Sequence, residues 1–183
     1  ESEPWSNEVV ERIFSKNVQA FCVDTNGNII DCILEEVDTE RNVEVLPVYL
    51  KVVDSKTEGI AVPVAGKGLW STVFGYIALE PDTDTVLGIQ FYKHGETPGL
   101  GGEVEKAWFT NNFVGKKIRS QDDRVIGIEV LKGKVDSSSP YSVHQVDGIS
   151  GATVTGKGVG NFLKEDLGRY ESYFNKVRAD GNI

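Results

Sequence analysis

The stretch Asp147-Gly148-Ile149-Ser150-Gly151-Ala152-Thr153-Val154-Thr155-Gly156-Lys157-Gly158 determines how the C-terminal part of this chain folds and what it can hold. It brings a glycine-rich turn and several hydroxyl side chains to the start of an amphipathic helix. Backbone N–H groups at a helix start point outward, and together with the helix dipole they favour a negatively charged ligand. Lys157 adds a cation at the same place. The stretch therefore predicts a phosphate site in front of the last helix.

A nucleotide-binding P-loop is one alternative for this stretch. The run from Gly151 to Lys157 fits G-x-x-x-x-G-K, but Gly158 stands where that motif has the Ser or Thr that binds Mg²⁺. The preceding run 141–146 alternates polar and apolar residues, whereas a P-loop follows a continuously apolar strand. A single helix follows the stretch, so no further parallel strands fit downstream. These features argue against a P-loop.

The composition is that of one soluble globular domain covering residues 1–183. Its formal net charge of -9 disfavours binding to nucleic acids and to anionic membrane surfaces, which are themselves negatively charged. No apolar run in the sequence is long enough to span a bilayer. Because the sequence has no Met, we expect that a signal peptide, a membrane anchor or another leader precedes Glu1 in the natural protein.

Hydrophobic periodicity predicts an α+β fold, a single domain with a largely antiparallel, twisted sheet and flanking helices. Hairpin patterns, in which turn residues separate two apolar runs, dominate the sequence. Strands are expected at 18–23, 29–37, 43–53, 72–79, 85–92, 125–131 and 141–146. Pro47 weakens the third of these strands. Helices are expected at 7–16, at 103–112 and over the apolar stripe 159–177.

Cys22 and Cys32 lie on two strand-like runs on either side of the turn around Asn26 and Gly27. They could face each other across that hairpin, depending on a register that the loop leaves open. A disulfide is possible outside the cytoplasm, but we favour two cysteines that act as small apolar residues. The sequence has no third Cys and no nearby His to complete a metal set, so we predict no metal site.

Three glycine-rich turns, at 66–70, 94–102 and 147–158, interrupt the strand pattern. Glycine allows a backbone to approach a flat or anionic ligand closely. Trp70 offers an aromatic surface to such a ligand. Hydroxyl groups in these turns belong to Thr97, Ser150, Thr153 and Thr155. Each turn alone could be an ordinary tight turn, but three of them in one chain indicate a shared site.

A hydrolytic site has little support in the sequence. His144 falls within an expected strand, which indicates a structural role, and His94 has no Ser or Cys nucleophile in a recognised elbow. Glu96 and Glu103 could act as an acid–base pair, but such pairs are more often solvated charges. We therefore predict no catalytic residue belonging to the chain itself, and instead a site whose bound cofactor reacts.

Three segments resemble the FMN-binding domain family in their order and spacing. They are Gly66-Lys67-Gly68-Leu69-Trp70, Glu96-Thr97-Pro98-Gly99-Leu100-Gly101 and Asp147-Gly148-Ile149-Ser150-Gly151-Ala152-Thr153. The third, Asp-x-x-Ser-Gly-Ala-Thr, is the most specific, and the resemblance extends from Val18 onward. Within the family, the chain is most similar to the C subunits of Na⁺-translocating NADH:quinone oxidoreductases, whose sister group is the G subunits of Rnf electron-transport complexes.

The resemblance implies that FMN is joined through its phosphate to the hydroxyl of Thr153, the last position of the motif. A separate, Mg²⁺-dependent flavin transferase makes this phosphoester, with FAD as the donor. Thr155 lies outside the motif, and an extended backbone between the two threonines would point both of them the same way. Asp147 and Ser150 would support the turn or be recognised by the transferase.

The resemblance also implies which residues surround the cofactor. Gly151 and Ala152 belong to the turn that holds the phosphate, and Lys157 would stabilise its charge. The segment from Glu96 to Gly101 would wrap the isoalloxazine ring. Within that segment, Thr97 and backbone donors, including those at Gly99, would reach the polar edge of the ring. Leu100 would cover one face of the ring, and Trp70 would line the pocket; both could instead be plain core residues.

The resemblance further implies membership of a bacterial respiratory complex that couples NADH oxidation and ubiquinone reduction to Na⁺ export. The domain would pass electrons one at a time between FMN and neighbouring redox centres in other subunits, and would itself bind neither NADH nor Na⁺. A single N-terminal transmembrane helix would anchor it on the periplasmic side of the inner membrane. Two alternatives stay open: an Rnf-type G protein of the electron-transport complex, and a non-redox envelope module that binds a small phosphorylated ligand.

Overall fold

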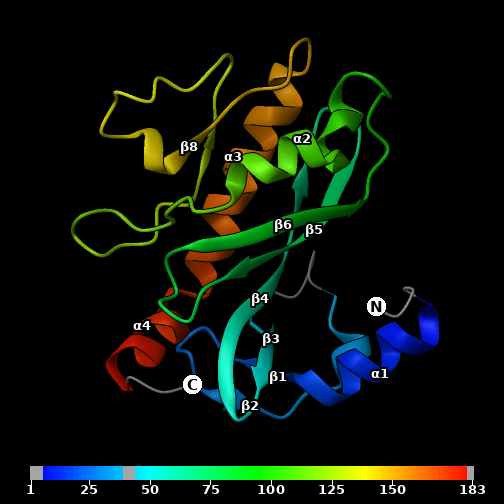
Figure 1. Cartoon of the computed structure of the whole chain (residues 1–183), viewed down its shortest axis with the longest axis vertical. Coiled ribbons are helices and arrows are strands. Elements are labelled where there is room, and N and C mark those ends of the chain that lie inside the picture. The colour runs from blue at the N-terminus through cyan, green and yellow to red at the C-terminus, as the bar shows by residue number, and fades with distance from the viewer. Residues whose placement is uncertain (1–5, 39–43, 181–183) are drawn as a thin grey trace.

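The computed structural model describes residues 6–38 and 44–180, and a twisted antiparallel sheet runs through it (Figure 1). The strand order is β2-β1-β3-β4-β5-β6, and every neighbouring pair is antiparallel. The bounds are β1 Val18–Val23, β2 Ile29–Ile30, β3 Leu46–Val53, β4 Lys56–Lys67, β5 Thr72–Leu79 and β6 Val86–Lys93. The predicted α+β class with a largely antiparallel sheet is confirmed.

Strand β4 is the longest of the sheet, and the sequence pattern did not predict it. Gly59, Pro63 and several alanines dilute its β-branched residues, which weakens the strand signal. Strands β3 and β4 pair from Val53–Lys56 up to Tyr49–Ala61, whereas the part of β3 before Tyr49 pairs with β1. The two strands therefore separate, and the second half of β4 pairs with β5 along its other edge.

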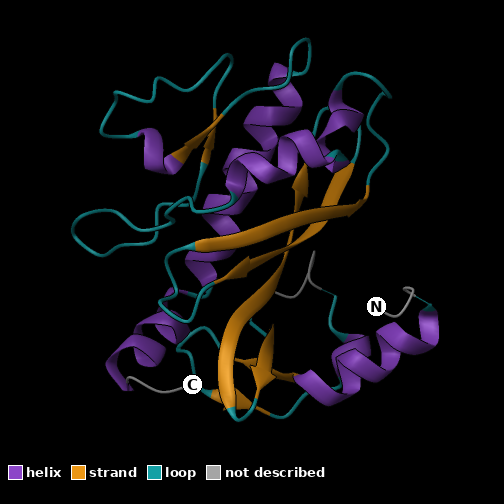
Figure 2. Ribbon diagram, viewed as in Figure 1, coloured by secondary structure: helices purple, strands orange, loops and turns teal. Residues whose placement is uncertain are grey.

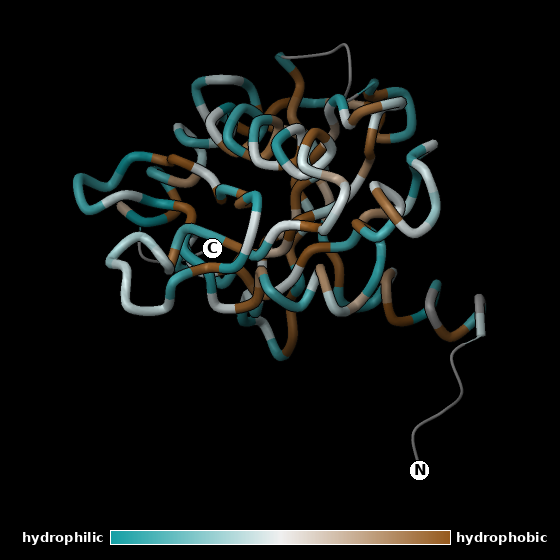
Figure 3. Tube along the Cα trace, turned by 90° about the horizontal axis from the view of Figure 1, so that it is seen from above, coloured by the Kyte–Doolittle hydropathy of each residue, from teal (hydrophilic) through white to brown (hydrophobic). Residues whose placement is uncertain are grey.

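The longest helix, α3, packs along β4, and the core lies between the sheet, this helix and the segment 101–149. The helices are α1 Asn7–Asn17, α2 Ala107–Thr110, α3 Thr153–Arg169 and α4 Glu171–Asp180. In Figure 1, α3 starts at the top of the molecule and passes behind β6, while α1 lies near the bottom. The loops that extend furthest to the left in Figure 3 are coloured mainly hydrophilic, as expected for solvated connections.

Several predicted elements are shorter or broken. The helix expected at 103–112 is instead a 3₁₀ turn, Gly101–Glu105, followed by the one-turn helix α2 and a second 3₁₀ turn, Asn111–Phe113. The strands expected at 29–37, 125–131 and 141–146 shrink to β2, to β7 Glu129–Val130 and to β8 Gln145–Val146. Strands β7 and β8 form a separate parallel pair. Figure 2 shows the loops that dominate this part of the chain.

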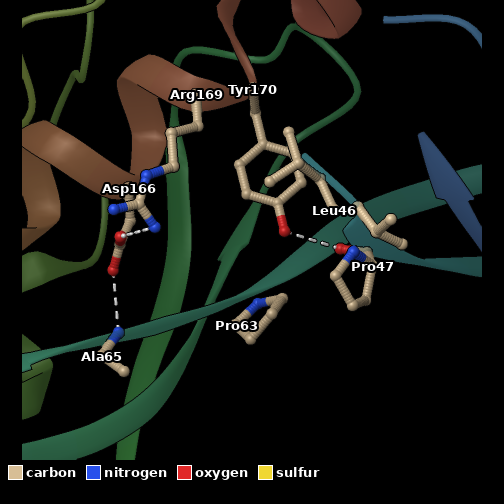
Figure 4. Close-up of a pocket in the computed structure, with 8 residues that line it drawn as sticks. Leu46, Pro47, Pro63, Ala65, Asp166, Arg169 and Tyr170 are labelled. Atoms are coloured by element: carbon tan, nitrogen blue, oxygen red, sulfur yellow. Dashed lines mark hydrogen bonds and ion pairs between the residues drawn. The ribbon is translucent and has the colours of Figure 1, made fainter. Parts of the chain in front are cut away.

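The break between α3 and α4 follows from a specific side-chain bond. One continuous helix was expected over 159–177, but α3 ends at Tyr170, whose hydroxyl donates to the carbonyl of Pro47 at 2.9 Å. Asp166, one turn earlier, accepts the N–H of Ala65 at 2.8 Å on the edge of β4 that faces away from β5. Arg169 lies 3.1 Å from the same carboxylate. The end of α3 therefore closes the gap between β3 and β4 (Figure 4).

Cys22 and Cys32 form a disulfide, so the expectation that they act as separate small apolar residues is wrong. Cys22 pairs with Ile30 across the short β1–β2 ladder, and Cys32 lies just beyond β2. Asp24 holds the intervening turn by accepting the N–H groups of Asn26 and Asn28. The turn brings the chain back within the 6.1 Å that separates the two Cα atoms.

Backbone contacts hold the first half of α3 on two sides. A Cβ atom at Gly158 would lie 2.2 Å from the carbonyl oxygen of Lys67 in β4. Cβ atoms at Gly156 and Gly160 would lie 3.0 Å and 3.3 Å from atoms of Val130 in β7. Glycine lowers helix propensity by about 1 kcal/mol per residue relative to Ala, so these glycines trade helix stability for close packing. The Gly158 that disagrees with a P-loop is thus a packing residue.

Candidate functional site

The three glycine-rich turns meet at the carboxylate of Glu96. Its Oε1 atom accepts the backbone N–H groups of Trp70 at 2.8 Å and of Ser71 at 3.0 Å, and its Oε2 atom accepts that of Leu69 at 3.1 Å. The Oε2 atom also accepts the hydroxyl of Thr155, at 2.6 Å. The structure thus brings the three turns together, with Glu96 beneath the site and not on its surface.

Glu96 is only 5% exposed, yet it is held in its charged form. Burial alone would raise the pKa of its carboxyl, but the Thr155 hydroxyl and the three backbone N–H groups hold this pKa below its ordinary value. Two glycines make room for the group. A Cβ atom at Gly68 would lie 2.7 Å from Oε1, and one at Gly101 would lie 2.6 Å from Oε2 and 2.7 Å from the Thr155 oxygen.

Thr153 and Thr155 face opposite directions, so the expectation that they point the same way is wrong. Helix α3 begins at Thr153 and includes both residues, so the segment between them is helical and not extended. Two steps along an α-helix turn a side chain by roughly 200° around the axis. Thr155 is 1% exposed, whereas Thr153 is exposed. One threonine hydroxyl is thus open to solvent, and the other is used inside the protein.

The start of α3 can receive an anion. The residue at the N-cap position is Ala152, and no side chain there accepts a hydrogen bond from the first turn. The N–H groups of this turn therefore have no side-chain acceptor at the cap, where most helices have one. Gly151 adopts a φ of +75°, which turns the chain into the helix. Lys157 is exposed one turn after Thr153, on the same side of the helix.

A groove of about 460 Å³ runs beside α3. One wall is the segment 126–132, and the other is the helix face that carries Thr153, Lys157 and Lys164. Lys132 contributes a third cation from the first wall. Lys132 and Lys164 were not predicted as site residues, because neither lies in a motif; helical spacing from Lys157 could have indicated Lys164 alone. The groove is a basic region on a domain whose net charge is negative.

Trp70 and Leu100 are surface residues, which excludes the alternative that they belong to the core. Trp70 is 71% exposed and Leu100 is 43% exposed. Leu100 contacts the phosphate turn, since a Cβ atom at Gly151 would lie 2.8 Å from its Cδ2 atom. Val154, which follows Thr153, is also exposed. Apolar side chains therefore stand open around the exposed threonine, where a flat apolar ligand could cover them.

The turn that carries Leu100 is fixed by its own backbone. The carbonyl of Thr97 accepts the N–H groups of Leu100 at 3.1 Å and of Gly102 at 2.9 Å. Gly99 has a φ of +74°, a conformation that glycine adopts without strain. The side chain of Thr97 is exposed, so its hydroxyl is open to a ligand, as the sequence predicted.

Asp147 stabilises the turn and does not line the site. One of its oxygens accepts the N–H of Val135 at 2.8 Å, and the other lies 2.6 Å from the ammonium group of Lys134. The hydrogen bond from Lys134 and then that from Val135 hold the pKa of Asp147 below its ordinary value. Ser150 is exposed in the same turn. Of the two roles considered for Asp147, the contacts match support of the turn.

The groups considered for hydrolysis have structural partners. The Nδ1 atom of His94 accepts the N–H of Glu96 at 3.2 Å, and Glu103 accepts the indole N–H of Trp108 at 3.0 Å. His144 lies in a 3₁₀ turn and not in a strand, with its Nδ1 atom 2.8 Å from the carbonyl of Lys117. Within residues 6–38 and 44–180, no three His, Cys, Asp or Glu side chains gather in a way that could hold a metal ion.

Comparisons with known proteins agree with this geometry. The model of the FMN-binding domain family matches residues 68–167, which include all three turns. The C subunit of the Na(+)-translocating NADH-quinone reductase of Pseudomonas aeruginosa is 46% identical over 134 residues, which cover 72% of this chain and 51% of that protein. Its counterpart in Vibrio alginolyticus is 39% identical over 148 residues, which cover 80% of this chain and 56% of that protein.

Two solved structures are also similar. The C subunit of the Na(+)-translocating NADH-quinone reductase from Parabacteroides distasonis has a TM-score of 0.82 and 33% identity, over 93% of this chain and 84% of that one. Shewanella oneidensis NqrC has a TM-score of 0.84 and 27% identity, over 97% of this chain and 91% of that one.

The chain spans about half the length of the curated relatives named above. Among its described residues, no helix is both long enough and apolar enough to cross a membrane. The predicted resemblance is nevertheless confirmed by the match to more than half of the chain. This chain belongs to the FMN-binding domain family, in the group formed by the C subunits of Na⁺-translocating NADH-quinone reductases.

Proposed function

We propose that this domain carries FMN covalently, through a phosphoester to Thr153, and serves as an electron carrier. The observation that supports the proposal is the contrast between two threonines at the start of α3. The hydroxyl of Thr153 is exposed in front of a helix start without a side-chain cap, whereas that of Thr155 is buried against Glu96. A modifying enzyme can reach the first hydroxyl and not the second.

The residues around Thr153 suit a phosphate. The phosphoester keeps one negative charge, which the dipole of α3 and the N–H groups of its first turn stabilise. Lys157 lies one turn away on the same side of the helix and adds a charge-assisted contact. Lys132 and Lys164 raise the positive potential along the adjoining groove.

The apolar residues around Thr153 suit the flavin ring, and FMN supplies the redox chemistry once it is bound. Trp70 and Leu100 are exposed without it, so covering them with a flat ring removes apolar surface from water. Thr97 offers a hydroxyl to the polar edge of the ring, and the tight turn at Gly99 keeps that hydroxyl next to Leu100. The chain therefore holds and orients the cofactor.

The bond to Thr153 is made by a separate, Mg²⁺-dependent flavin transferase that uses FAD. The threonine oxygen bonds to the phosphorus on the FMN side of the diphosphate, the bond to the bridging oxygen breaks, and AMP leaves. The hydroxyl proton passes to a base of the transferase. Within the domain, Glu96 is unsuited to this task, because its two oxygens already accept four hydrogen bonds and its pKa is lowered.

In the complex, the domain passes electrons between its FMN and redox centres in other subunits. The names of the similar proteins support a complex that oxidises NADH, reduces ubiquinone and exports Na⁺. The disulfide between Cys22 and Cys32 supports the periplasmic side of the inner membrane, because disulfides persist in oxidising compartments.

The test is to express the domain with and without a flavin transferase and to measure its intact mass. Co-expression should add the mass of FMN less one water, and flavin fluorescence should remain on a denaturing gel. Thr153→Ala should abolish both signals, while the control Thr153→Ser should keep them because a hydroxyl remains. Covalent flavin in a host without the transferase, or fluorescence retained by Thr153→Ala, would contradict the proposal.

A further inference from the structure

We infer that Glu96 and Thr155 form a positioning pair that selects the hydroxyl of Thr153 for modification. This inference rests on the proposed function. Thr155 donates its hydroxyl proton to Glu96 at 2.6 Å inside the protein, and this bond sets the rotation of the first turn of α3. With Thr155 turned inward, Thr153 is turned outward, since the two side chains lie roughly 200° apart on the helix.

Glu96 can act as a fixed point because its surroundings leave it little freedom. Its oxygens accept three successive N–H groups, those of Leu69, Trp70 and Ser71, as well as the Thr155 hydroxyl. An ionised carboxylate accepts and does not donate, so the protons of all four donors point toward it. The pair therefore ties the helix start to the turn before β5.

The same group also orients the aromatic residue of the site. Three donors in a row hold the backbone of the turn so that the side chain of Trp70 stands outward, where it is 71% exposed. The hydroxyl of Ser71 accepts the N–H of Gly95 at 2.7 Å, which ties this turn to the one before Leu100. Glu96 thus controls both the acceptor hydroxyl and one wall of the proposed flavin pocket.

The space around the pair is too small for another arrangement. A Cβ atom at Gly101 would clash with both members of the pair, at 2.6 Å from Glu96 and 2.7 Å from Thr155. Behind them, Gly158 packs against the carbonyl of Lys67 at a distance that excludes a Cβ atom. The helix start can neither rotate nor move toward β4, so the hydrogen bond has one geometry. Loss of the Thr155 hydroxyl should therefore loosen the acceptor turn.

The experiment measures the rate of flavin transfer to purified wild-type, Thr155→Val, Thr155→Ser and Glu96→Gln domains. Purified flavin transferase, FAD and Mg²⁺ are added, and intact mass is followed over time at several domain concentrations. Thr155→Val should lower kcat/KM roughly tenfold or more, since small errors in the position of a reacting group are costly. Thr155→Ser should restore the rate to near wild type, and Glu96→Gln should be at least as slow as Thr155→Val.

Tyr170→Phe is the matched control. It removes one buried hydroxyl hydrogen bond from the other end of the same helix, so it has a comparable effect on stability without touching the site. Its rate of flavin transfer should equal that of the wild type. An unchanged rate in Thr155→Val, or an equal loss in Tyr170→Phe or Thr155→Ser, would overturn the positioning pair.

Two further readouts separate this inference from the proposed function. If wild-type domain accepts no FMN at Thr153, the proposed function fails, and FMN on Thr155 would overturn the positioning pair as well. Amide hydrogen exchange on the unmodified domain tests the pair without any flavin. The N–H groups of Trp70 and Ser71 should exchange faster in Thr155→Val than in wild type or Tyr170→Phe. Unchanged exchange at both amides would overturn the pair.

Discussion

Glu96 and Asp166 are buried carboxylates at the two ends of α3, and burial affects their charge in opposite ways. Glu96 is 5% exposed and Asp166 is 6% exposed. Hydrogen bonds outweigh burial at Glu96, and its pKa is lowered. Burial dominates at Asp166, where it raises the pKa to about 6 despite the N–H of Ala65 and the charge of Arg169. Asp166 also has more of the protein around it than Glu96 has.

The difference between these two carboxylates lies in their donors. Four donors converge on Glu96, three of them backbone N–H groups that cannot turn away. Asp166 accepts a single backbone N–H, and its charged partner Arg169 is partly exposed. A buried carboxylate is therefore a rigid, charged anchor at the end of α3 that carries the site. At the other end, a buried carboxyl group closes the gap between β3 and β4.

The largest effect is expected from filling the space at the Glu96 end. Gly101→Ala should lower the free energy of unfolding by about 3 kcal/mol or more, because the added methyl group overlaps both Glu96 and Thr155. Gly88→Ala is the matched control, since a Cβ atom there meets nothing within 4 Å. Chemical denaturation of both variants measures the difference. Equal stability of the two variants would show that the space around Glu96 is not tight.

Neutralising each carboxylate should separate the two ends of the helix. At about pH 7, Glu96→Gln should cost about 2–3 kcal/mol, because an amide group turns an N–H toward donors that need an acceptor. Asp166→Asn should change stability by less than about 1 kcal/mol, since the amide oxygen can still accept the N–H of Ala65 and a buried charge is removed. Denaturation midpoints with a common slope give both values. A larger loss in Asp166→Asn would reverse the comparison.

The two carboxylates should also give opposite pH dependences. The folded-state pKa of Asp166 lies above its unfolded value, so its contribution is full below about pH 4 and is lost as the pH rises through about 6. That change should be on the order of 2 kcal/mol, and Asp166→Asn should remove it. The contribution of Glu96 runs the other way and is lost as the pH falls below the ordinary range of a carboxyl group. Identical pH profiles for wild type and Asp166→Asn would refute the assignment.

The smallest effect concerns charge beside the acceptor end of α3. Lys157→Glu should slow flavin transfer and lower the melting temperature of the flavin-loaded domain, by about 1 kcal/mol in equivalent free energy. Lys164→Glu places the same charge about 10 Å further along the helix, where salt screens most of its effect. The ratio of the two transfer rates at low salt measures the difference. Equal rates for both variants and the wild type would remove Lys157 from the phosphate site.

Much of the sheet could be predicted from the sequence, because hairpins repeat a local pattern. The turn between β5 and β6 and that after β1 stand between alternating apolar runs, and both strand pairs are confirmed. Strand β4 could not be predicted, since Gly59 and Pro63 interrupt its pattern, and its pairing with β3 and β5 is a property of the assembled sheet. The short elements after Phe113 depend on packing against α3 in the same way.

The site could be predicted in part. Its three turns are visible in the sequence because glycine marks them, and the structure brings them together around one side chain. The role of Glu96 could not be predicted, because its main partners are backbone N–H groups that leave no side-chain pattern. The opposite facing of Thr153 and Thr155 depends on where α3 begins, and helix starts are poorly marked when Ala152 holds the cap position.

Peptide mapping of the flavin-loaded domain tests the central claim most directly. The wild-type domain is treated with flavin transferase, FAD and Mg²⁺, digested, and sequenced by tandem mass spectrometry. The buried hydrogen bond between Thr155 and Glu96 predicts FMN on Thr153 alone, with Ser150 and Thr155 unmodified. FMN on Thr155, on Ser150 or on any residue other than Thr153 would contradict the account.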